Sequence, residues 1–258
     1  MAHKRVIDSH QHLWMMSERA YSWIAPEYGP LYDDFSPERL APEIPPSGVT
    51  DSILVQAADT YEDTFYMLDV AAHSNFVKGV RNLSHDYSNA KYESDDKWIL
   101  RPAVLETIAM VEKAGLAFDY VAVNPAHVDT VPVLAAKFPT LKIVVDHFAK
   151  PDIAGKTWEP WASQMSTLAK QKNVYMKFSG LNTASAPGWS VADWQPYVDH
   201  VVKEFGANRT LLGGDWPVIV LMNNYVEVWK AQLEAISKYS AEDQEWITHK
   251  TAELIYGI

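Results

Sequence analysis

This sequence of 258 residues lacks cysteine, long apolar runs and clustered positive charge. The absence of cysteine excludes disulfides, thiolate nucleophiles, iron–sulfur clusters and zinc bound through cysteine. No stretch approaches 18 apolar residues, and the first 14 residues have no apolar segment after their basic residues. We therefore expect neither a membrane span nor a signal peptide, and a cytoplasmic protein that does not interact with membranes.

The charge balance is strongly negative, with 22 Lys and Arg against 33 Asp and Glu and a formal net charge of −11. A chain this acidic repels phosphate backbones, and no basic run offsets that repulsion. We therefore expect no nucleic-acid partner and a small molecule as the substrate. The sequence leaves a homo-oligomer open.

Short apolar runs alternate with helical patterns along the chain, which is typical of a parallel sheet connected by helices. Hydrophobic residues make up 48% of the sequence and no linker divides it, so we expect one domain over residues 1–258. The predicted strands are Arg5–His12, Asp51–Ala57, Phe76–Leu83, Ala117–Val123, Lys142–His147, Val174–Ser179 and Thr210–Asp215. The predicted helices are Thr60–Ala72, Pro102–Ala114, Pro125–Lys137, Glu159–Lys170, Val191–Phe205, Asn223–Lys238 and Ala241–Tyr256. The proline-rich segment Pro37–Pro46 is interpreted as a loop after the first strand.

A closed barrel and an open doubly wound sheet both fit this alternation. An open nucleotide-binding sheet usually has a glycine-rich turn after its first strand. Here the first strand ends instead in His-Gln-His-Leu-Trp. The pattern favours a TIM-like barrel, in which catalytic groups lie at the C-terminal ends of the strands.

Chemistry-bearing side chains end three of the predicted strands. Asp8, His10 and His12 alternate along the first strand and are expected on one side of it. His147 ends the fifth strand, and Asp215 ends the last one after two glycines. The three histidines and Asp215 can bind one divalent ion, zinc or manganese, or activate a water without metal. Structural histidines and an ion-paired carboxylate are the alternative.

Two cations and several aromatic residues can complete such a site. Arg81 and Lys177 lie in predicted strands and could hold a substrate carbonyl or carboxylate. A structural ion pair inside the barrel is the alternative for both, and Asp146 fits a cap or an ion-pair partner. Stacking on a ring suits aromatic side chains, although core packing is the alternative for each. The candidate pocket walls are Trp14, Tyr21, Trp23, Tyr87 and Trp216.

Five short motifs occur in the order found in one known family. They are IDSHQHLW at residues 7–14, Val80-Arg81, DHFAKP at 146–151, KFSGL at 177–181 and GDWPV at 214–218. With these motifs the chain resembles the amidohydrolase superfamily, amidohydrolase 2 type. Within that type it is similar to the lactonase branch, which includes L-fuconolactonase, L-rhamnonolactonase, 4-sulfomuconolactone hydrolase and 2-pyrone-4,6-dicarboxylate lactonase.

The resemblance implies a distorted (β/α)8 barrel that opens lactone rings with water. It implies that Asp215 is the general base on water and later the proton donor to the leaving oxygen. His147 would bind the substrate carbonyl or the water, with His10 and His12 beside it, and Arg81 would anchor the substrate. Some members of the branch work without metal, whereas more distant ones need one or two divalent ions.

The chain departs from the family's pattern in two places. Relatives often carry His where this chain has Asn82, and His85 could replace that substrate contact. Relatives also have another strand and helix before Val80-Arg81, whereas here residues 75–77 run straight into that strand. Because closing a barrel links strand number, tilt and stagger, we predict seven strands with one βα unit missing, or an irregular segment in the eighth place.

Three functions stay open on the sequence alone. The first is a hydrolase that opens a sugar aldonolactone or a related small carboxylated lactone. The second is a metal-dependent amidohydrolase or nonoxidative decarboxylase acting on a small carboxylic acid. The third is a barrel that lost catalysis with its missing unit and only binds a ligand. The five ordered motifs favour the first.

Overall fold

The computed structural model describes residues 5–58, 60–74, 76–81 and 95–258, with the backbone alone for 78–81. Each of the seven apolar runs predicted as a strand contains one, and all the pairings are parallel. The strands form two sheets, in the orders β1-β2-β3 and β4-β5-β6-β7. Their bounds are β1 Ile7–Gln11, β2 Asp51–Val55, β3 Val77–Arg81, β4 Ala117–Tyr120, β5 Lys142–Val145, β6 Val174–Phe178 and β7 Thr210–Leu212.

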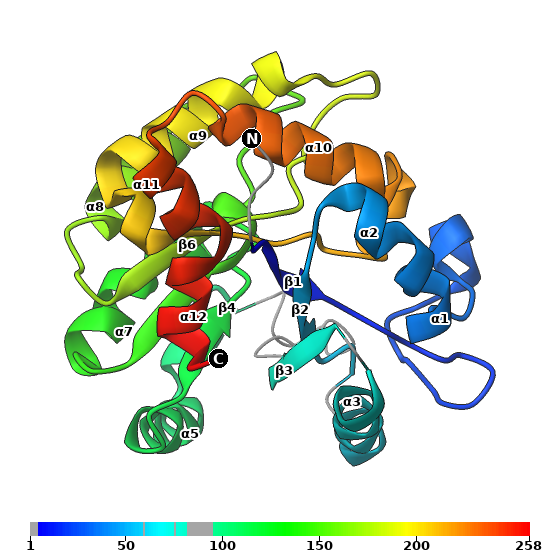
Figure 1. Ribbon diagram of the computed structural model, residues 1–258. Helices are drawn as coiled ribbons and strands as arrows, with labels where there is room; N and C mark the ends of the chain where they lie inside the picture. The colour runs from blue at the N-terminus through cyan, green and yellow to red at the C-terminus, as the bar shows by residue number, and fades with distance from the viewer. Residues whose placement is uncertain (1–4, 59, 75, 82–94) are drawn as a thin grey trace.

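The helices surround these strands on the outside (Figure 1). Their bounds are α1 Pro37–Leu40, α2 Ile44–Ser47, α3 Tyr61–His73, α5 Pro102–Lys113, α6 Pro125–Val128, α7 Val131–Lys137, α8 Trp161–Leu168, α9 Val191–Phe205, α10 Tyr225–Ile236, α11 Ala241–Glu245 and α12 Thr251–Tyr256. The predicted helix at 125–137 is therefore two helices, because Pro132 has no N–H to continue the first one. In the described residues no helix has the length and apolar character needed to cross a membrane.

The proline-rich segment is helical, so its interpretation as a loop was wrong. It contains α1, a 3-10 turn at Ala41–Glu43 and α2. Pro37, Pro42 and Pro45 each lie in the first turn of one of these elements. A proline is tolerated there because the first N–H groups of a helix need no partner within it. A segment with several prolines can therefore be helical when each proline lies in the first turn of a short helix.

The two sheets meet along β1 and the segment after β7, which gives a distorted TIM-like barrel. Gln11 pairs with Trp216 in a parallel bridge, and the His12 N–H donates to the Trp216 carbonyl at 2.7 Å. On the opposite side, β3 and β4 are the outer strands of their sheets. Residues 82–94 lie between them in sequence and outside the described residues, so the seven-strand expectation stays a prediction.

The interior of the barrel is layered from apolar to polar along the strands. Ile7, Ile53, Val144 and Leu211 pack with residues of α12, including Ile255, which closes the end where the strands begin. Each such side chain stabilises the fold by about 1.5–3 kcal/mol when fully buried. The buried Asp119, Asp146 and Lys177 come next, and the histidines follow at the C-terminal strand ends. Apolar side chains therefore fill the end of the barrel where the strands begin, and the polar side chains lie at the opposite end.

Candidate active site

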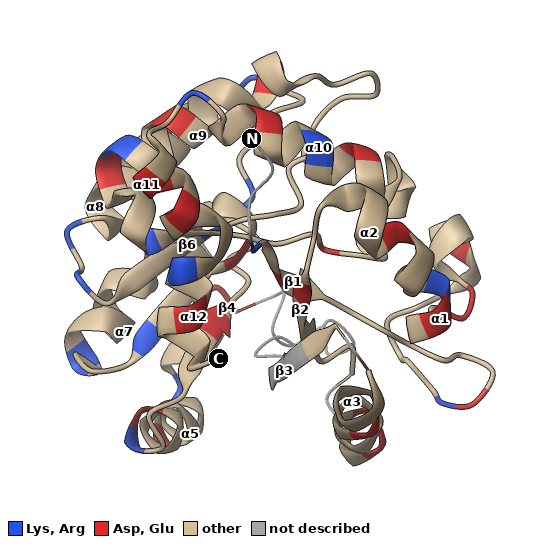
Figure 2. Cartoon of the chain, in the orientation of Figure 1, with Lys and Arg blue, Asp and Glu red and all other residues tan. Residues whose placement is uncertain are grey.

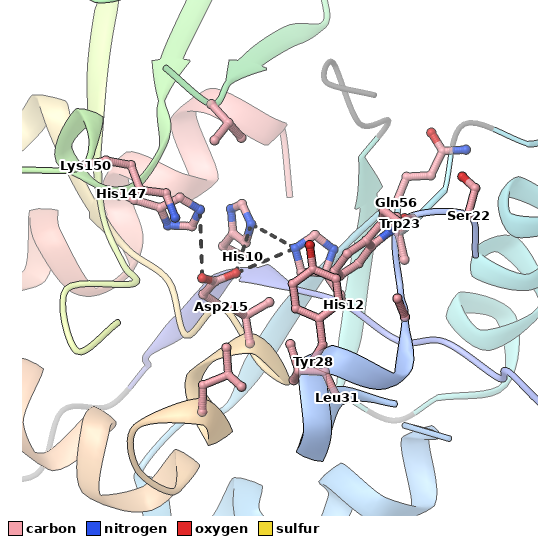
Figure 3. Close-up of a pocket in the computed structure, with 15 residues that line it drawn as sticks. His10, His12, Ser22, Trp23, Tyr28, Leu31, Gln56, His147, Lys150 and Asp215 are labelled. Carbon is pink, nitrogen blue, oxygen red and sulfur yellow. Dashed lines mark hydrogen bonds and ion pairs between the residues drawn. The ribbon is translucent and has the colours of Figure 1, made fainter. Parts of the chain in front are cut away.

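A cavity of about 490 Å³ opens at the C-terminal ends of the strands. Polar side chains that reach it include His10 and His12 of the first strand's end, Asp215 after β7, and His147 and Lys150 after β5 (Figure 3). Apolar residues of the segments that follow β1 and β7 form much of the remaining wall. They include Trp23, Tyr28, Leu31, Val218 and Leu221. The cavity therefore joins a compact polar cluster to an apolar wall, as small-molecule sites usually do.

The four residues predicted from the strand ends lie together around Asp215. Its Oδ1 is 3.6 Å from His10 Nε2 and 3.7 Å from His12 Nε2, and its Oδ2 is 3.9 Å from His147 Nε2. The two histidines of the first strand are 3.1 Å apart at their Nε2 atoms. His12 Nδ1 lies 3.1 Å from the Val55 carbonyl, so this nitrogen carries the proton and Nε2 presents its lone pair.

The two glycines before Asp215 let the chain approach β1 closely. A Cβ on Gly213 would lie 2.8 Å from the His10 Cβ, and one on Gly214 would lie 2.6 Å from Asp8 Oδ2. Asp215 itself has a φ of 63°, and its N–H donates to the His10 carbonyl at 2.6 Å. A side chain at either glycine would therefore push Asp215 away from the histidines.

His147 starts a left-handed turn of four residues, His147–Lys150, with φ values of 55, 50, 58 and 54°. Left-handed backbone costs about 1–2 kcal/mol per residue without glycine, so surrounding packing must hold the turn. Trp161 Nε1 donates to the Phe148 carbonyl at 2.6 Å, and the Phe148 ring stacks on Phe178 at 5.2 Å. His147 Nδ1 lies 2.8 Å from Ser179 Oγ, which orients the imidazole.

Burial shifts the ionisation of the cluster in a direction that suits proton transfer. Desolvation raises the pKa of Asp215 from 3.8 to about 7, although the positive charge of Lys150 opposes the rise. Desolvation also holds the pKa values of His10 and His147 well below 6.5. At neutral pH these two histidines are neutral while Asp215 populates both forms, so it can accept a proton and return it.

Comparison with known proteins assigns this arrangement to a family. Residues 68–258 match the family model described as amidohydrolase. The chain belongs to the amidohydrolase family. A curated relative, the L-fucono-1,5-lactonase of Burkholderia ambifaria, is 35% identical to this amidohydrolase over 257 residues, or 88% of this chain and 86% of the relative. The resemblance inferred from the five sequence motifs is thereby confirmed.

Solved structures confirm the barrel. An amidohydrolase from Burkholderia multivorans with bound HEPES is 23% identical with a TM-score of 0.84, and covers 98% of this chain and 99% of that one. A second crystal form with bound zinc has a TM-score of 0.83 at 22% identity and the same coverage. A probable 2-pyrone-4,6-dicarboxylic acid hydrolase from Acinetobacter baumannii has a TM-score of 0.74 at 16% identity, covering 98% and 100% of the chains. These likenesses establish a TIM-like α/β fold for this amidohydrolase.

Asp8 does not line the cavity with the histidines, contrary to the expectation from strand alternation. The register of β1 against β2 shifts between Asp8 and Gln11, so a strict two-residue period does not hold there. The Asp8 carboxylate instead accepts hydrogen bonds from the Gly214 N–H and the Tyr225 hydroxyl, both at 2.7 Å, and from the His10 backbone N–H at 3.0 Å. Burial raises its pKa to about 6. Asp8 therefore ties β1 to the glycine segment and to α10.

Lys177 does not line the cavity of this amidohydrolase, contrary to its prediction as a substrate contact. Its side chain is 0% exposed, and its Nζ lies 2.6 Å from Asp119 Oδ2 and 3.0 Å from Asp146 Oδ1. The ammonium is also 3.4 Å from His10 Nδ1, on the side of the ring away from Asp215. Tyr256 of α12 donates to Asp119 at 2.8 Å. Lys177 and Asp146 thus form the buried ion pair considered as the alternative.

The aromatic candidates fall into two layers. Trp23 lines the cavity, whereas Trp14 is buried behind it at a ring separation of 5.4 Å. Trp216 is also buried and packs against Phe35 at 5.2 Å. Tyr21 donates to Asp63 at 3.2 Å and is buried as well. Neither Trp14 nor Trp216 lines the cavity, because Phe35 of the loop after β1 packs against both rings. Their predicted roles as substrate contacts stay predictions.

Two predicted substrate contacts cannot be placed. The Arg81 backbone ends β3 and pairs with Val55 of β2, but its side chain lies outside the described residues. His85 lies outside them too, together with Asn82 and Tyr87. Their predicted roles stay predictions.

Sequence reasoning missed Lys150 and, apart from Trp23, the residues of the apolar wall. Lys150 belongs to the DHFAKP motif, so its position three residues after His147 was a usable signal. Tyr28 and Leu31 carry no such signal, because loop conformation decides which of their side chains reach a cavity. Gln56 directly follows β2 and also lines the cavity. A residue next to a strand's C-terminal end is a reasonable candidate in a barrel.

The cluster has the composition of a site for one divalent ion. His10, His147 and Asp215 each offer one donor atom, and these atoms lie within 4.8 Å of one another. Neutral imidazoles and a carboxylate are common zinc ligands, and catalytic zinc often has three protein ligands. His12 Nε2 lies 3.7 Å from Asp215 Oδ1 but is not among these atoms, so His12 as a fourth ligand stays a prediction. A bound ion would polarise a carbonyl or lower the pKa of a water.

Proposed function

We propose that this amidohydrolase opens the ring of a lactone, either a sugar aldonolactone or a related small carboxylated lactone, by attack of water. The observation that carries the proposal is Asp215, a buried carboxylate with a pKa of about 7 placed among three histidines at a cavity. The 35% identity to an L-fucono-1,5-lactonase supports the choice of a lactone as the substrate.

In the proposed reaction Asp215 takes a proton from water as the water oxygen attacks the carbonyl carbon. The ring carbon–oxygen bond then breaks, and Asp215 returns the proton to the leaving ring oxygen. His147 contacts the carbonyl oxygen or the water, and His10 and His12 lie beside it. A neutral imidazole can donate its N–H to the carbonyl oxygen and so stabilise the negative charge that develops there.

The purified protein is expected to hydrolyse at least one five- or six-membered aldonolactone. The test follows acid release with a pH indicator across a panel that includes L-fucono-1,5-lactone and L-rhamnono- and D-galactono-lactones. Spontaneous hydrolysis is subtracted with heat-denatured protein. A panel without any enzymatic acid release would contradict the proposal.

Metal dependence distinguishes the second candidate, a metal-dependent hydrolase or nonoxidative decarboxylase acting on a small carboxylic acid. The donor group of His10, His147 and Asp215 supports it, as does the zinc in the Burkholderia multivorans structure. We propose that no metal is required, since Asp215 can act as a base by itself at neutral pH. Protein stripped with a chelator and analysed for metal should keep its lactonase activity. Activity lost on stripping and restored by zinc or manganese would favour the second candidate.

We further propose one domain whose barrel has seven strands and lacks one βα unit. The seven described strands and the two sheets that meet along β1 and β7 support this architecture. An experimental structure with an eighth parallel strand between β3 and β4 would contradict it. A barrel that only binds a ligand is disfavoured, because three strand ends still bring His10, His147 and Asp215 together.

A further inference from the structure

The left-handed turn after β5 presents two side chains to the cavity, and the proposed reaction uses only one of them. The Lys150 N–H donates to the His147 carbonyl at 2.9 Å, which closes a turn of three-residue periodicity. Residues three apart in such a turn lie on the same face. Phe148 and Ala149 between them are buried, whereas His147 and Lys150 both line the cavity. Figure 3 shows Lys150 beside His147, next to Asp215.

The Lys150 side chain brings a positive charge to the cavity. It is the one Lys or Arg among the described residues that line the cavity. No carboxylate in the described part of the chain lies within ion-pair distance of it, in contrast to Lys177. Its charge nevertheless acts on the site, because it lowers the pKa values of both Asp215 and His147.

The backbone at Lys150 is held in a conformation that this residue would otherwise avoid. It has a φ of 54° and a ψ of 62°, and it directly precedes Pro151. A residue before proline strongly prefers extended backbone. Residues with such unfavourable backbone angles persist where the surrounding packing enforces them, and they cluster at functional sites. Here the strained backbone carries a lysine whose side chain lines the same cavity as the proposed base.

We propose that Lys150 binds the oxyanion formed during lactone hydrolysis and then the carboxylate of the ring-opened product. The inference rests on the proposed function. As water adds to the carbonyl carbon, the carbonyl π electrons move onto its oxygen, which becomes negative. When the ring carbon–oxygen bond breaks, the leaving oxygen takes its proton from Asp215, and the new acid loses its own proton to solvent. While the oxyanion exists, Asp215 holds the proton taken from water and is neutral, and the ammonium stabilises the negative oxygen. Once Asp215 has returned that proton it is a carboxylate again, and the ammonium offsets its repulsion of the product carboxylate.

Binding of acid and alcohol probes to Lys150→Met tests this role. The probes are the sodium salt of the acid formed from the best lactone of the panel, and the matching alditol, which has an alcohol in place of the carboxylate. Titration calorimetry should show the Kd of the acid at least tenfold weaker in Lys150→Met, with the Kd of the alditol within twofold. The kcat should fall at least tenfold, and Lys150→Arg should keep most of the acid affinity.

Lys156→Met is the matched control, because Lys156 is an exposed lysine of the same loop that also has a positive φ of 54°. It removes the same charge and should change neither Kd nor kcat. If Lys150→Met does not fold, Lys150→Gln is judged by the same criteria. An acid Kd within twofold of wild type would overturn the inference while lactonase activity stands. A wild type that hydrolyses no lactone would overturn the proposed function instead.

Discussion

Asp215→Asn should lower the kcat of lactone hydrolysis by about 10²–10⁴-fold, because the amide cannot take a proton from water. The substitution keeps the shape of the side chain, and asparagine tolerates the φ of 63° at this position well. The KM should change little, since the cavity wall stays intact. Steady-state kinetics on the best lactone of the panel measure the effect.

The same substitution should stabilise the protein at alkaline pH. The pKa of Asp215 rises from 3.8 to about 7 on folding, so between these values the unfolded chain binds fewer protons than the folded one. Stability is therefore lost as the pH rises through this window, by up to about 4 kcal/mol once the buried carboxylate is charged. Metal-free Asp215→Asn should unfold at higher urea than wild type at pH 8, and at a similar concentration at pH 4.

Asp69→Asn is the matched control, because the Asp69 side chain is 72% exposed on α3 and far from the chemistry in sequence. It should leave both the kcat and the pH dependence of unfolding as in wild type. An Asp215→Asn variant with more than a tenth of the wild-type kcat would remove Asp215 from the role of general base. Equal urea midpoints of variant and wild type at pH 8 would contradict the raised pKa.

Lys177→Met should be the most destabilising substitution in the barrel interior, by about 3–5 kcal/mol. The ammonium is 0% exposed and within 3.0 Å of carboxylate oxygens of both Asp119 and Asp146. Its removal takes away a cation that faces two buried carboxylates, whereas the Asp119 carboxylate keeps its hydrogen bond from Tyr256. The Tm should fall by roughly 6–20 °C for a chain of this size, as measured by calorimetry.

Lys172→Met, which removes an exposed lysine five residues earlier, should change stability by less than about 0.5 kcal/mol. Combining Lys177→Met with Asp119→Asn should recover part of the loss, because one of the two buried negative charges is then gone. A Lys177→Met variant with a wild-type Tm would show that the ion pair does not stabilise the fold.

Local patterns predicted the strands and the central cluster correctly for a physical reason. Buried parallel strands are apolar on both faces, so each of the seven runs was visible without knowledge of its neighbours. His10, His12, His147 and Asp215 directly follow or end such runs, and the strands of a barrel end at one rim. The prediction that Asp8 lies on the same side of the strand as the histidines failed. The pairing of β1 with β2 shifts in register after Asp8, and local patterns do not show such a shift.

The sequence by itself determined the family, the alternation of strands and helices, and the set of strand-end residues that form the site. These features depend on residue type and order, which are local. Only the tertiary structure decided that Lys177 is buried in an ion pair, that Asp215 has a pKa near neutrality, and that Lys150 faces the cavity. Each of these depends on desolvation or on a strained turn, and both arise from residues that are distant in sequence and packed around the site.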